Sequence, residues 1–446
     1  MTQTPVGRLI ASLALPATVS VLITNFYSMA DTYFVSGLGV NESGATGIVY
    51  ALMGIIQSVG FLFGTGAGSH IAILLGKGEN ESAKRFCATT VYFGISVGIV
   101  LAVLGAVFIR PLMYFLGSTD LILEHAVSYG RYILIALPIM IGAFILNNTY
   151  RYEGKAFIGM IGLAAGGLLN ILGDFLLIRV FGWGIEGAGL ATCVSQYISF
   201  IILVIPFFFH KSNLSLHPGY VTRDFGLIKK VVFIGLPSLI RQGLFSVSSL
   251  TLNHCAAMVG AEFAIAAMSI VGRIINLIYS FALGIGHGFQ PVSGFNFGAK
   301  RYDRVKRSMV FMIFYAIIWL TIMAVGVYML AYKIIVLFRD DPQIIDIAVV
   351  ALRAQCVVLP MLPLQICGNM SHQAVGDVVR TAVLASFRSG LFFIPFVMIG
   401  SRVFGLAGLE FAQPAADIVA TAVSLPFLIA LFRRLTAMQK KGIIEA

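Results

Sequence analysis

Charged side chains are scarce in this sequence. They make up 11% of its 446 residues, against 59% hydrophobic residues and a mean hydropathy of +0.94. A water-soluble domain carries roughly 25% charged residues, so the composition excludes a soluble globular protein and indicates a polytopic membrane protein. Collagen-like repeats, heptads, Ser/Pro-rich tracts and long charge blocks are also missing, and we therefore expect no appended soluble domain.

Cysteines are few, and their pattern points to no metal site. The five are odd in number, fall within apolar segments and show neither CxxC nor mixed Cys/His spacing: Cys87, Cys193, Cys255, Cys356 and Cys367. Buried apolar thiols are the expected role for such residues.

A formal net charge of +11 would suit nucleic acid, but the distribution of the basic residues argues against it. Between the apolar segments, twenty Lys and Arg lie on one side of the predicted membrane and five on the other. Such an excess marks the cytoplasmic side. We therefore expect a bilayer rather than nucleic acid as the partner, with both termini in the cytoplasm.

Twelve segments have the roughly 20 apolar residues that a membrane span needs. They start near residues 9, 45, 86, 121, 156, 187, 231, 263, 309, 343, 381 and 408. The start of the chain lacks the features of a cleaved signal, so residues 9–35 are predicted as a retained first helix. The predicted fold is all-α, a polytopic membrane protein with twelve transmembrane helices in two pseudo-symmetric six-helix lobes. Its predicted parts are an N-terminal lobe (1–209), a cytoplasmic interlobe loop (210–230), a C-terminal lobe (231–432) and a cytoplasmic tail (433–446).

The two halves of the sequence look duplicated. A shift of 223 positions superposes "RVFG" at 179–182 on "RVFG" at 402–405, and a shift of 222 superposes Gly64, Gly66, Gly76, Lys84 and Arg85 on Gly286, Gly288, Gly298, Lys306 and Arg307. Because each half holds an even number of helices, the repeats should be parallel, an architecture that usually places a substrate cavity between its halves.

A few polar residues stand out inside the predicted N-terminal spans. Asp31 follows a long apolar stretch, with Tyr27 one turn before it, and Asn170 and Asp174 share one face of the fifth helix. A charge inside a membrane costs roughly 3 kcal/mol, so such acids usually face a cavity and bind an ion or proton. The alternative is a carboxylate close enough to the outer surface to be hydrated.

Helix direction places these residues at one depth. Asp31, Asp174 and Thr192, which lies in the sixth helix, all fall in the outer third of their spans. Two carboxylates, the Asn170 amide and a hydroxyl suit a hard cation such as sodium, and two neighbouring acids also favour protonation. Asp31, Asn170, Asp174 and Thr192 are therefore candidate sodium ligands if sodium is the coupling ion. A proton is the other candidate, and no cofactor is expected.

The C-terminal half offers bases rather than an equivalent acid pair. Arg241 follows Pro237 within a span and needs a charged partner or a water-filled cavity; a structural ion pair remains the alternative. The last helix contains Glu410 and Asp417, which can pair with the bases of this half, among them Arg241 and Arg388. For each histidine, a structural hydrogen bond is the expected role. Tentative substrate contacts are Asn147, Arg241, Gln242 and His287.

Two stretches of the sequence are similar to enzyme motifs, but their residues do not have the spacing that those motifs require. The glycine-rich stretches "GTGAGSHIAILLGKGENESAKR" and "GIGHGFQPVSGFNFGAKRYDRVKR" lack the phosphate-loop pattern. The acidic run "RDDPQIID" (339–346) has the wrong spacing for a prenyltransferase and lies in a predicted outer loop. We expect no enzyme activity, and the repeat with its isolated polar cluster favours a transporter over a channel.

The sequence resembles the multidrug and toxic compound extrusion (MATE) antiporters over essentially its whole length. The resemblance rests on "LALPATVSVLITNFYSMADTYFVSGLG", on "NILGDFLLI" followed by "GIEGAGLATCVSQ", and on "QPVSGFNFGAKRYDRVKR". It implies alternating access and export of mostly cationic, amphipathic compounds driven by sodium or protons. In the DinF-like and related prokaryotic branches, the matching N-lobe cation-site positions are Asp31, Asn170, Asp174 and Thr192, with Tyr27 beside them.

The seventh helix departs from the NorM branch, since "GLPSLIRQGLFSVSSL" contains no acid. This departure favours cation coupling in the N-lobe. The predicted protein is a monomeric antiporter of a prokaryotic cytoplasmic membrane that exports small amphipathic molecules. A lipid-linked oligosaccharide flippase of the same superfamily is the nearest alternative, because such a protein needs a cavity rich in basic residues.

Overall fold

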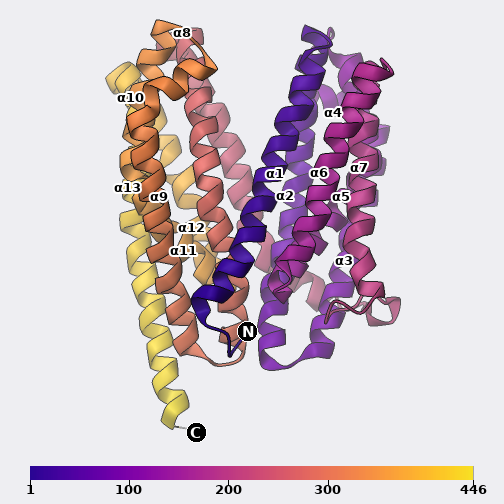
Figure 1. Ribbon diagram of the computed structural model, residues 1–446, viewed down its shortest axis with the longest axis vertical. Helices are drawn as coiled ribbons and strands as arrows, with labels where there is room; N and C mark the ends of the chain where they lie inside the picture. The colour runs from indigo at the N-terminus through magenta and orange to yellow at the C-terminus, as the bar shows by residue number, and fades with distance from the viewer. Residues whose placement is uncertain (445–446) are drawn as a thin grey trace. The chain divides into compact units, whose positions relative to one another are not determined.

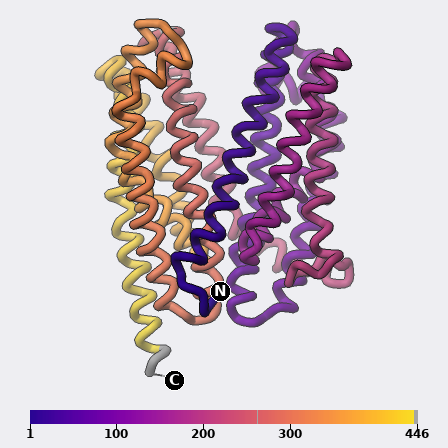
Figure 2. Tube along the Cα trace, in the orientation of Figure 1, coloured from indigo at the N-terminus to yellow at the C-terminus, as the bar shows by residue number. Residues whose placement is uncertain are grey.

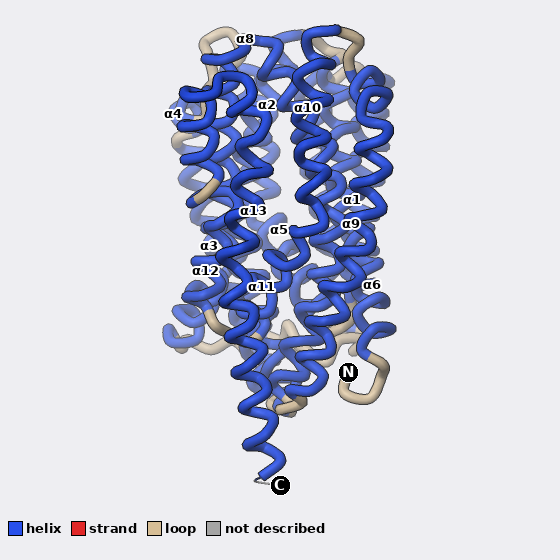
Figure 3. Tube along the Cα trace, turned by 90° about the vertical axis from the view of Figure 1, so that its left-hand side faces the viewer, coloured by secondary structure: helices blue, strands red, loops and turns tan. Residues whose placement is uncertain are grey.

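The computed structural model describes residues 1–444, and every regular element in that range is helical (Figures 1 and 3). The all-α prediction is confirmed. The elements of the first half are α1 (Val6–Ser36), α2 (Val40–Lys77), α3 (Asn80–Val107), α4 (Ile109–Phe115), α5 (Leu123–Glu153), α6 (Ala156–Asp174), the π-helix η1 (Phe175–Val180), α7 (Gly184–Phe208) and the 3₁₀ turn η2 (Pro218–Tyr220).

The second half begins with the longest helical element. Its elements are α8 (Phe225–Gly298), α9 (Tyr302–Phe338), α10 (Pro342–Val358), the 3₁₀ turn η3 (Leu359–Met361), α11 (Leu362–Ala374), α12 (Val378–Ser386), the π-helix η4 (Phe387–Leu391) and α13 (Phe393–Ile444). Two apolar segments of α8 are each long enough to cross a membrane: Phe225–Gly260 and Glu262–Gly298.

Eleven helical segments of the described residues are long and apolar enough to cross a membrane. The last, Val378–Lys441, is 64 residues long. It is interrupted at Gly405, where φ is 58° and ψ is −129°, which is not a helical conformation. The segment therefore comprises two helices, and the predicted total of twelve spans is confirmed.

The backbone repeats its chain reversals at the offset that the sequence predicts. Left-handed φ angles, which interrupt a helix, occur at three matched pairs of positions 222 or 223 residues apart: Gly78 and Lys300, Gly154 and Gly376, and Gly182 and Gly405. Figure 2 shows the Cα trace coloured by residue number. The two halves thus share the positions of their chain reversals as well as identical residues, which supports duplication.

Close helix packing is repeated as well. A Cβ atom added at Gly64 would lie 2.8 Å from the Asn148 side chain, and one added at Gly286 would overlap the sulfur of Met370. Gly286 lies 222 positions after Gly64, and Met370 lies 222 positions after Asn148. The glycines of the two rich stretches therefore allow helices to approach closely, as expected from the sequence.

The chain divides into two compact units. The starts of α1 and α8 each belong to a different unit from the rest of the same helix. The N-terminal unit is Val19–Gly235, while the C-terminal unit comprises Met1–Thr18 and the residues from Leu236 onward. The first eighteen residues, assigned by sequence to the N-terminal lobe, thus pack in the other unit: Ala14 lies against Gly288, and the Arg304 guanidinium donates to the carbonyls of Met1 and Thr4.

The N-terminal unit is built around α5. This helix packs against α2, α3, α6 and α7, and two-thirds of its most apolar window is buried, the largest share of any span. In the C-terminal unit, α13 packs against α9, α10 and α11. A side chain on the inner face of α5 is therefore surrounded by helices on several sides.

The predicted interlobe loop is shorter than the sequence indicated and is fixed to the N-terminal unit. Helix α8 already begins at Phe225, where the Asp224 carboxylate accepts a hydrogen bond from the Gly226 amide at 2.8 Å. The buried Glu153 carboxylate accepts from the Ser212 hydroxyl at 2.7 Å and from the Asn213 amide at 2.5 Å. These bonds hold the start of the loop against α5.

The close approach of α2 and α8 gives a testable prediction. A Cβ atom at Gly235 would overlap the backbone carbonyl of Leu62, whereas one at Gly243 would meet nothing within 4 Å. Because a backbone atom cannot rotate away, we expect Gly235→Ala to destabilise the protein by about 1–3 kcal/mol. Thermal unfolding of the purified protein in detergent measures the effect. Gly243→Ala is the matched control, and an equal loss in both variants would contradict the packing.

Candidate functional site

The two N-terminal acids lie buried in the same unit. Asp31 is on α1 with 3% of its surface exposed, and Asp174 is the last residue of α6 and is fully buried. Each carboxyl group acts electrostatically on the other. The structure therefore brings together the two acids that the sequence singled out.

Two tyrosines hold one oxygen of Asp31. The Tyr50 hydroxyl of α2 donates to Oδ2 at 2.9 Å, and the Tyr129 hydroxyl of α5 donates to the same atom at 3.0 Å. Hydrogen bonds to a charged group stabilise by about 1.5–3 kcal/mol each. These bonds fix the orientation of Asp31 between three helices.

The remaining polar residues of the cluster are linked to Tyr129. The Asn170 amide donates to the Thr192 hydroxyl at 3.0 Å, and that hydroxyl lies 3.5 Å from the Tyr129 oxygen. Both Asn170 and Thr192 are about 2% exposed. The four residues predicted as cation ligands thus meet in one buried network, which we call the acid cluster: Asp31, Tyr50, Tyr129, Asn170, Asp174 and Thr192.

Several oxygens of the acid cluster have no donor. Within residues 1–444, both Asp174 oxygens, Oδ1 of Asp31 and Oδ1 of Asn170 are buried without a hydrogen-bond partner. Two ionised carboxylates only accept hydrogen bonds, so Asp31 and Asp174 can bond to each other only when one of them carries a proton. An unpaired buried charge is costly. The cluster can therefore accept a proton or a metal cation.

The donor set fits sodium as well as a proton. Two carboxylates and one carboxamide oxygen are hard ligands, which bind alkali and alkaline-earth cations in proteins. No group of three or more His, Cys, Asp or Glu that could hold a metal occurs in the described part of the chain. The cluster is thus suited to an exchangeable cation rather than to a tightly held transition metal.

Glycines on α6 allow the cluster to form. A Cβ at Gly173 would lie 2.8 Å from Ala191, and one at Gly166 would lie 2.8 Å from Ser199, both on α7. Their absence brings Asn170 of α6 close to Thr192 of α7. Immediately after Asp174 the helix widens into η1, a π-helical turn of the kind often found at functional sites.

Sequence reasoning missed Tyr50 and Tyr129. Both lie near the outer ends of their predicted spans, so the depth comparison that selected Thr192 could have included them. Tyr27, which was predicted, lies beside the cluster, and its ring packs 3.5 Å from the Cβ position of Gly167 on α6. Among the described residues, the hydroxyls that donate to Asp31 are those of Tyr50 and Tyr129, not that of Tyr27.

The tentative substrate residues are divided between the units. Asn147 is half-buried on α5 of the N-terminal unit, with its amide 2.8 Å from the Cβ position of Gly159. Arg241 and Gln242 are half-buried on the first span of α8, and His287 is buried on its second span. Their role in substrate binding stays a prediction.

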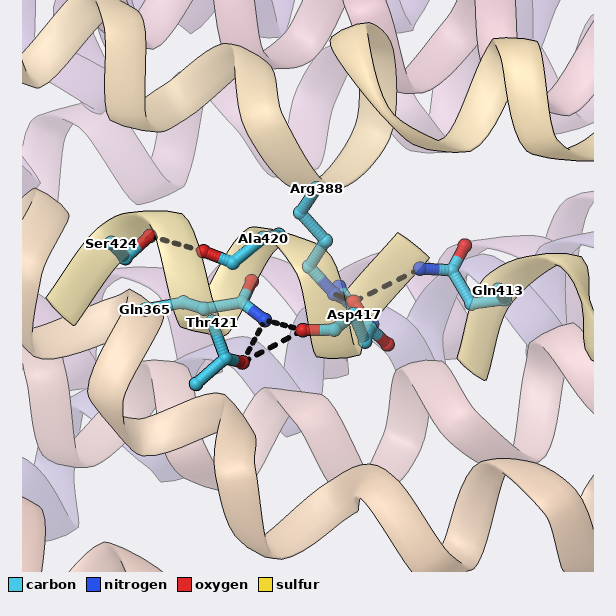
Figure 4. A network of polar contacts seen from close by, with 7 residues as sticks. All are labelled: Gln365, Arg388, Gln413, Asp417, Ala420, Thr421 and Ser424. Atoms are coloured by element: carbon cyan, nitrogen blue, oxygen red, sulfur yellow. Dashed lines mark hydrogen bonds and ion pairs between the residues drawn. The ribbon is translucent and has the colours of Figure 1, made fainter. Parts of the chain in front are cut away.

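The C-terminal unit contains a polar network in which the acid is paired with a base (Figure 4). Asp417 of α13 accepts from the Arg388 guanidinium at 3.0 Å and from the Gln413 amide at 3.1 Å. The Arg388 guanidinium also lies 4.3 Å from the centre of the Tyr279 ring. The predicted pairing of Asp417 with a base is thus observed, whereas Glu410 joins no ion pair among the described residues.

The two buried acid sites therefore differ in charge balance. Asp417 has a cationic partner within its own unit, and Gln365 links its backbone to Thr421 through bonds of 2.8 and 2.7 Å. No cationic side chain is paired with Asp31 or Asp174 in residues 1–444. The first arrangement is typical of a structural ion pair, and the second of a site whose positive partner is mobile.

The acid cluster also gives a prediction about Tyr129. Tyr129→Phe removes one donor to Asp31; if the cluster couples a cation to transport, a loss of about 1.5–3 kcal/mol corresponds to a decrease of roughly 10- to 100-fold in that transport. Tyr197→Phe is the matched control, because the Tyr197 hydroxyl donates only to the backbone carbonyl of Ile135. Initial efflux rates in proteoliposomes test the difference, and equal rates in the two variants would contradict the assigned role.

A family model described as MatE matches residues 16–176 and 237–399. The matched stretches include Asp31 and Asp174, and they fall on corresponding parts of the two halves. Together they cover more than half of the chain.

Curated relatives match over nearly the whole chain. The multidrug export protein MepA of Staphylococcus saprophyticus is 24% identical over 433 residues, which cover 97% of this chain and 95% of the relative. The protein of the same name from Staphylococcus aureus strain MSSA476 is 25% identical over 435 residues, which cover 97% and 96% of the two chains.

Solved structures share the fold. One is an outward-facing multidrug resistance MATE family transporter of the MOP superfamily, with a TM-score of 0.92, 23% identity and 98% of each chain covered. Another is a MOP superfamily transporter from Pyrococcus furiosus, described as having a binding pocket of reverse polarity, with a TM-score of 0.91, 23% identity, and 98% of this chain and 97% of that chain covered.

Proposed function

We propose that this chain, which belongs to the MatE family, is a secondary-active exporter of amphipathic, mostly cationic small molecules. The two relatives named as multidrug export proteins support drug export and do not favour the oligosaccharide flippase. Because those relatives and the structural neighbours are transporters, we propose no catalytic reaction. The exporter would act as a monomer in a prokaryotic cytoplasmic membrane, with both termini in the cytoplasm.

The acid cluster is the proposed site of cation coupling. The observation that carries this proposal is the set of buried oxygens without donors on Asp31, Asn170 and Asp174. A proton or a sodium ion bound there would neutralise the pair, and its release would leave two ionised carboxylates repelling each other. If sodium is the coupling ion, Asp31, Asn170, Asp174 and Thr192 would hold it.

Helix α1 is the element that would respond to the charge of the cluster. Asp31 belongs to the N-terminal unit, while the start of α1 belongs to the C-terminal unit. Pro16 lies just before this division and has no amide N–H to continue the helical hydrogen bonds. We propose that α1 bends or repacks near Pro16 when the acids gain or lose a cation. Coupling requires that the cation bind one conformation more tightly than the other.

Dye efflux from proteoliposomes under separate sodium and pH gradients tests the proposed function. We expect an inward gradient of at least one of the two ions to drive efflux of a cationic dye. Collapse of that gradient with an ionophore should stop it. Dye movement that continues unchanged without any ion gradient would reject secondary-active transport.

A further inference from the structure

A groove of about 610 Å³ lies on the C-terminal unit, between the beginning of α9 and the end of α13. Its polar end is formed by the first turns of α9 with Lys306 and Arg307. Its apolar end is reached about 13 Å further along the same helix, at Tyr315, since a helix rises 1.5 Å per residue. The groove therefore has a charged end and an aromatic end, and neither belongs to the acid cluster.

In the part of the chain that the structure describes, the basic side chains at the cationic end of the groove are not neutralised by an acidic partner. The Lys306 ammonium donates to the Thr436 hydroxyl at 3.2 Å and lies 5.6 Å from the centre of the Phe432 ring. These contacts fix the side chain while using only one of its three N–H donors. Arg307 takes part in none of the ion pairs of residues 1–444. Asp303 also lines the groove, but its carboxylate is paired with Arg301 at 3.4 Å.

The other end presents aromatic and aliphatic side chains to the surroundings. The Phe311 and Tyr315 rings are stacked with centroids 4.0 Å apart, and Phe314 meets Tyr315 edge-on at 5.7 Å. Phe314 is 59% exposed and Val310 is 56% exposed. On a membrane-spanning helix, such side chains contact lipid tails.

Charge complementarity identifies the occupant. Around the cationic end, the ends of α8, α9 and α13 carry further basic residues, all of which are exposed: Lys300, Arg301, Arg433, Arg434, Lys440 and Lys441. Basic sites beside a membrane helix attract anionic lipid headgroups. We propose that this groove binds an anionic glycerophospholipid, with its phosphate at Lys306 and Arg307 and its acyl chains along Val310, Phe314 and Tyr315.

Native mass spectrometry of the delipidated full-length protein, titrated with phosphatidylglycerol or phosphatidylcholine of equal chain length, tests the proposal. Each basic residue near a membrane surface contributes about 1 kcal/mol to anionic-lipid binding. We therefore expect Lys306→Gln/Arg307→Gln to weaken phosphatidylglycerol binding roughly 10- to 30-fold and to leave phosphatidylcholine binding unchanged.

The matched control changes the same charge elsewhere. Lys229→Gln/Lys230→Gln removes two exposed basic residues of the N-terminal unit and should leave both affinities unchanged. An equal loss in the control would overturn the proposal, because binding would then follow net charge alone. Inorganic phosphate that competes as strongly as the lipid would overturn it too, because the apolar end would then contribute nothing. Phe314→Ser should weaken binding of both lipids if that end holds acyl chains.

Discussion

Asp31→Asn is expected to abolish gradient-driven export while folded protein remains in the membrane. Asparagine keeps the shape of the side chain and can still accept hydrogen bonds from Tyr50 and Tyr129, so the helices should pack as before. It cannot carry the negative charge that a proton or sodium neutralises. Without that charge, the cation has no preference between conformations and cannot shift them. Dye efflux from proteoliposomes, with protein content measured in the same vesicles, gives the result.

The control for this variant is an acid outside the cluster. Asp120 is exposed and accepts a hydrogen bond from the Tyr114 hydroxyl at 2.6 Å. Asp120→Asn makes the same chemical change and should retain efflux. Gradient-dependent efflux that persists in Asp31→Asn would show that the acid cluster does not couple the cation to transport.

Asp417→Leu is expected to destabilise the protein by about 3–5 kcal/mol, because it leaves the Arg388 guanidinium inside the C-terminal unit without its anionic partner. The two side chains are 20% and 3% exposed, so solvent compensates little for the loss. Thermal or denaturant unfolding of the purified protein measures the change. The cation–π contact with Tyr279 is retained and offsets only part of the loss.

A double variant separates the charge from the packing. Arg388→Met/Asp417→Leu removes both charges and should recover most of the lost stability, since apolar residues of similar volume often replace a buried ion pair without penalty. The exposed pair of Arg110 and Glu124, 2.8 Å apart, is the reference; Glu124→Gln should change stability little. If Asp417→Leu unfolds like Glu124→Gln, the buried pair is not structural.

Periodicity and composition were sufficient to predict the spans. Long apolar segments can satisfy their backbone only as helices in a bilayer, so the twelve spans and their starts followed from hydropathy. The offset between the two repeats was predicted from identical residues, and the same offset separates the turns at Gly154 and Gly376. The start of α8 at Phe225 was missed because Lys229 and Lys230 interrupt the apolar pattern of its first turns.

The exchange of helix starts could not be predicted. Residues 1–18 are as apolar as the rest of α1, and hydropathy does not state which neighbour a helix contacts. The contact depends on glycines far away in sequence, such as Gly288 against Ala14. A glycine in a span predicts close helix packing, but it does not predict which helix is in contact.

The acid cluster was predicted in part. Asp31, Asn170, Asp174 and Thr192 could be selected because acids are rare in spans and helix direction gives their depth. Tyr50 and Tyr129 share that depth, but their residue type gave no reason to select them, because an aromatic residue in a span is usually part of the packing or of the membrane interface. Their function depends on hydroxyl positions that only the folded chain supplies.

The central claim is that the Asp31 and Asp174 carboxyl groups alternately hold and release a cation. Infrared difference spectroscopy of the purified protein measures protonated carboxyl groups directly. Raising the pH, or adding sodium at constant pH, should remove a protonated-carboxyl band that is absent from Asp31→Asn and Asp174→Asn but present in Asp120→Asn. The same band change in all three variants would contradict the account.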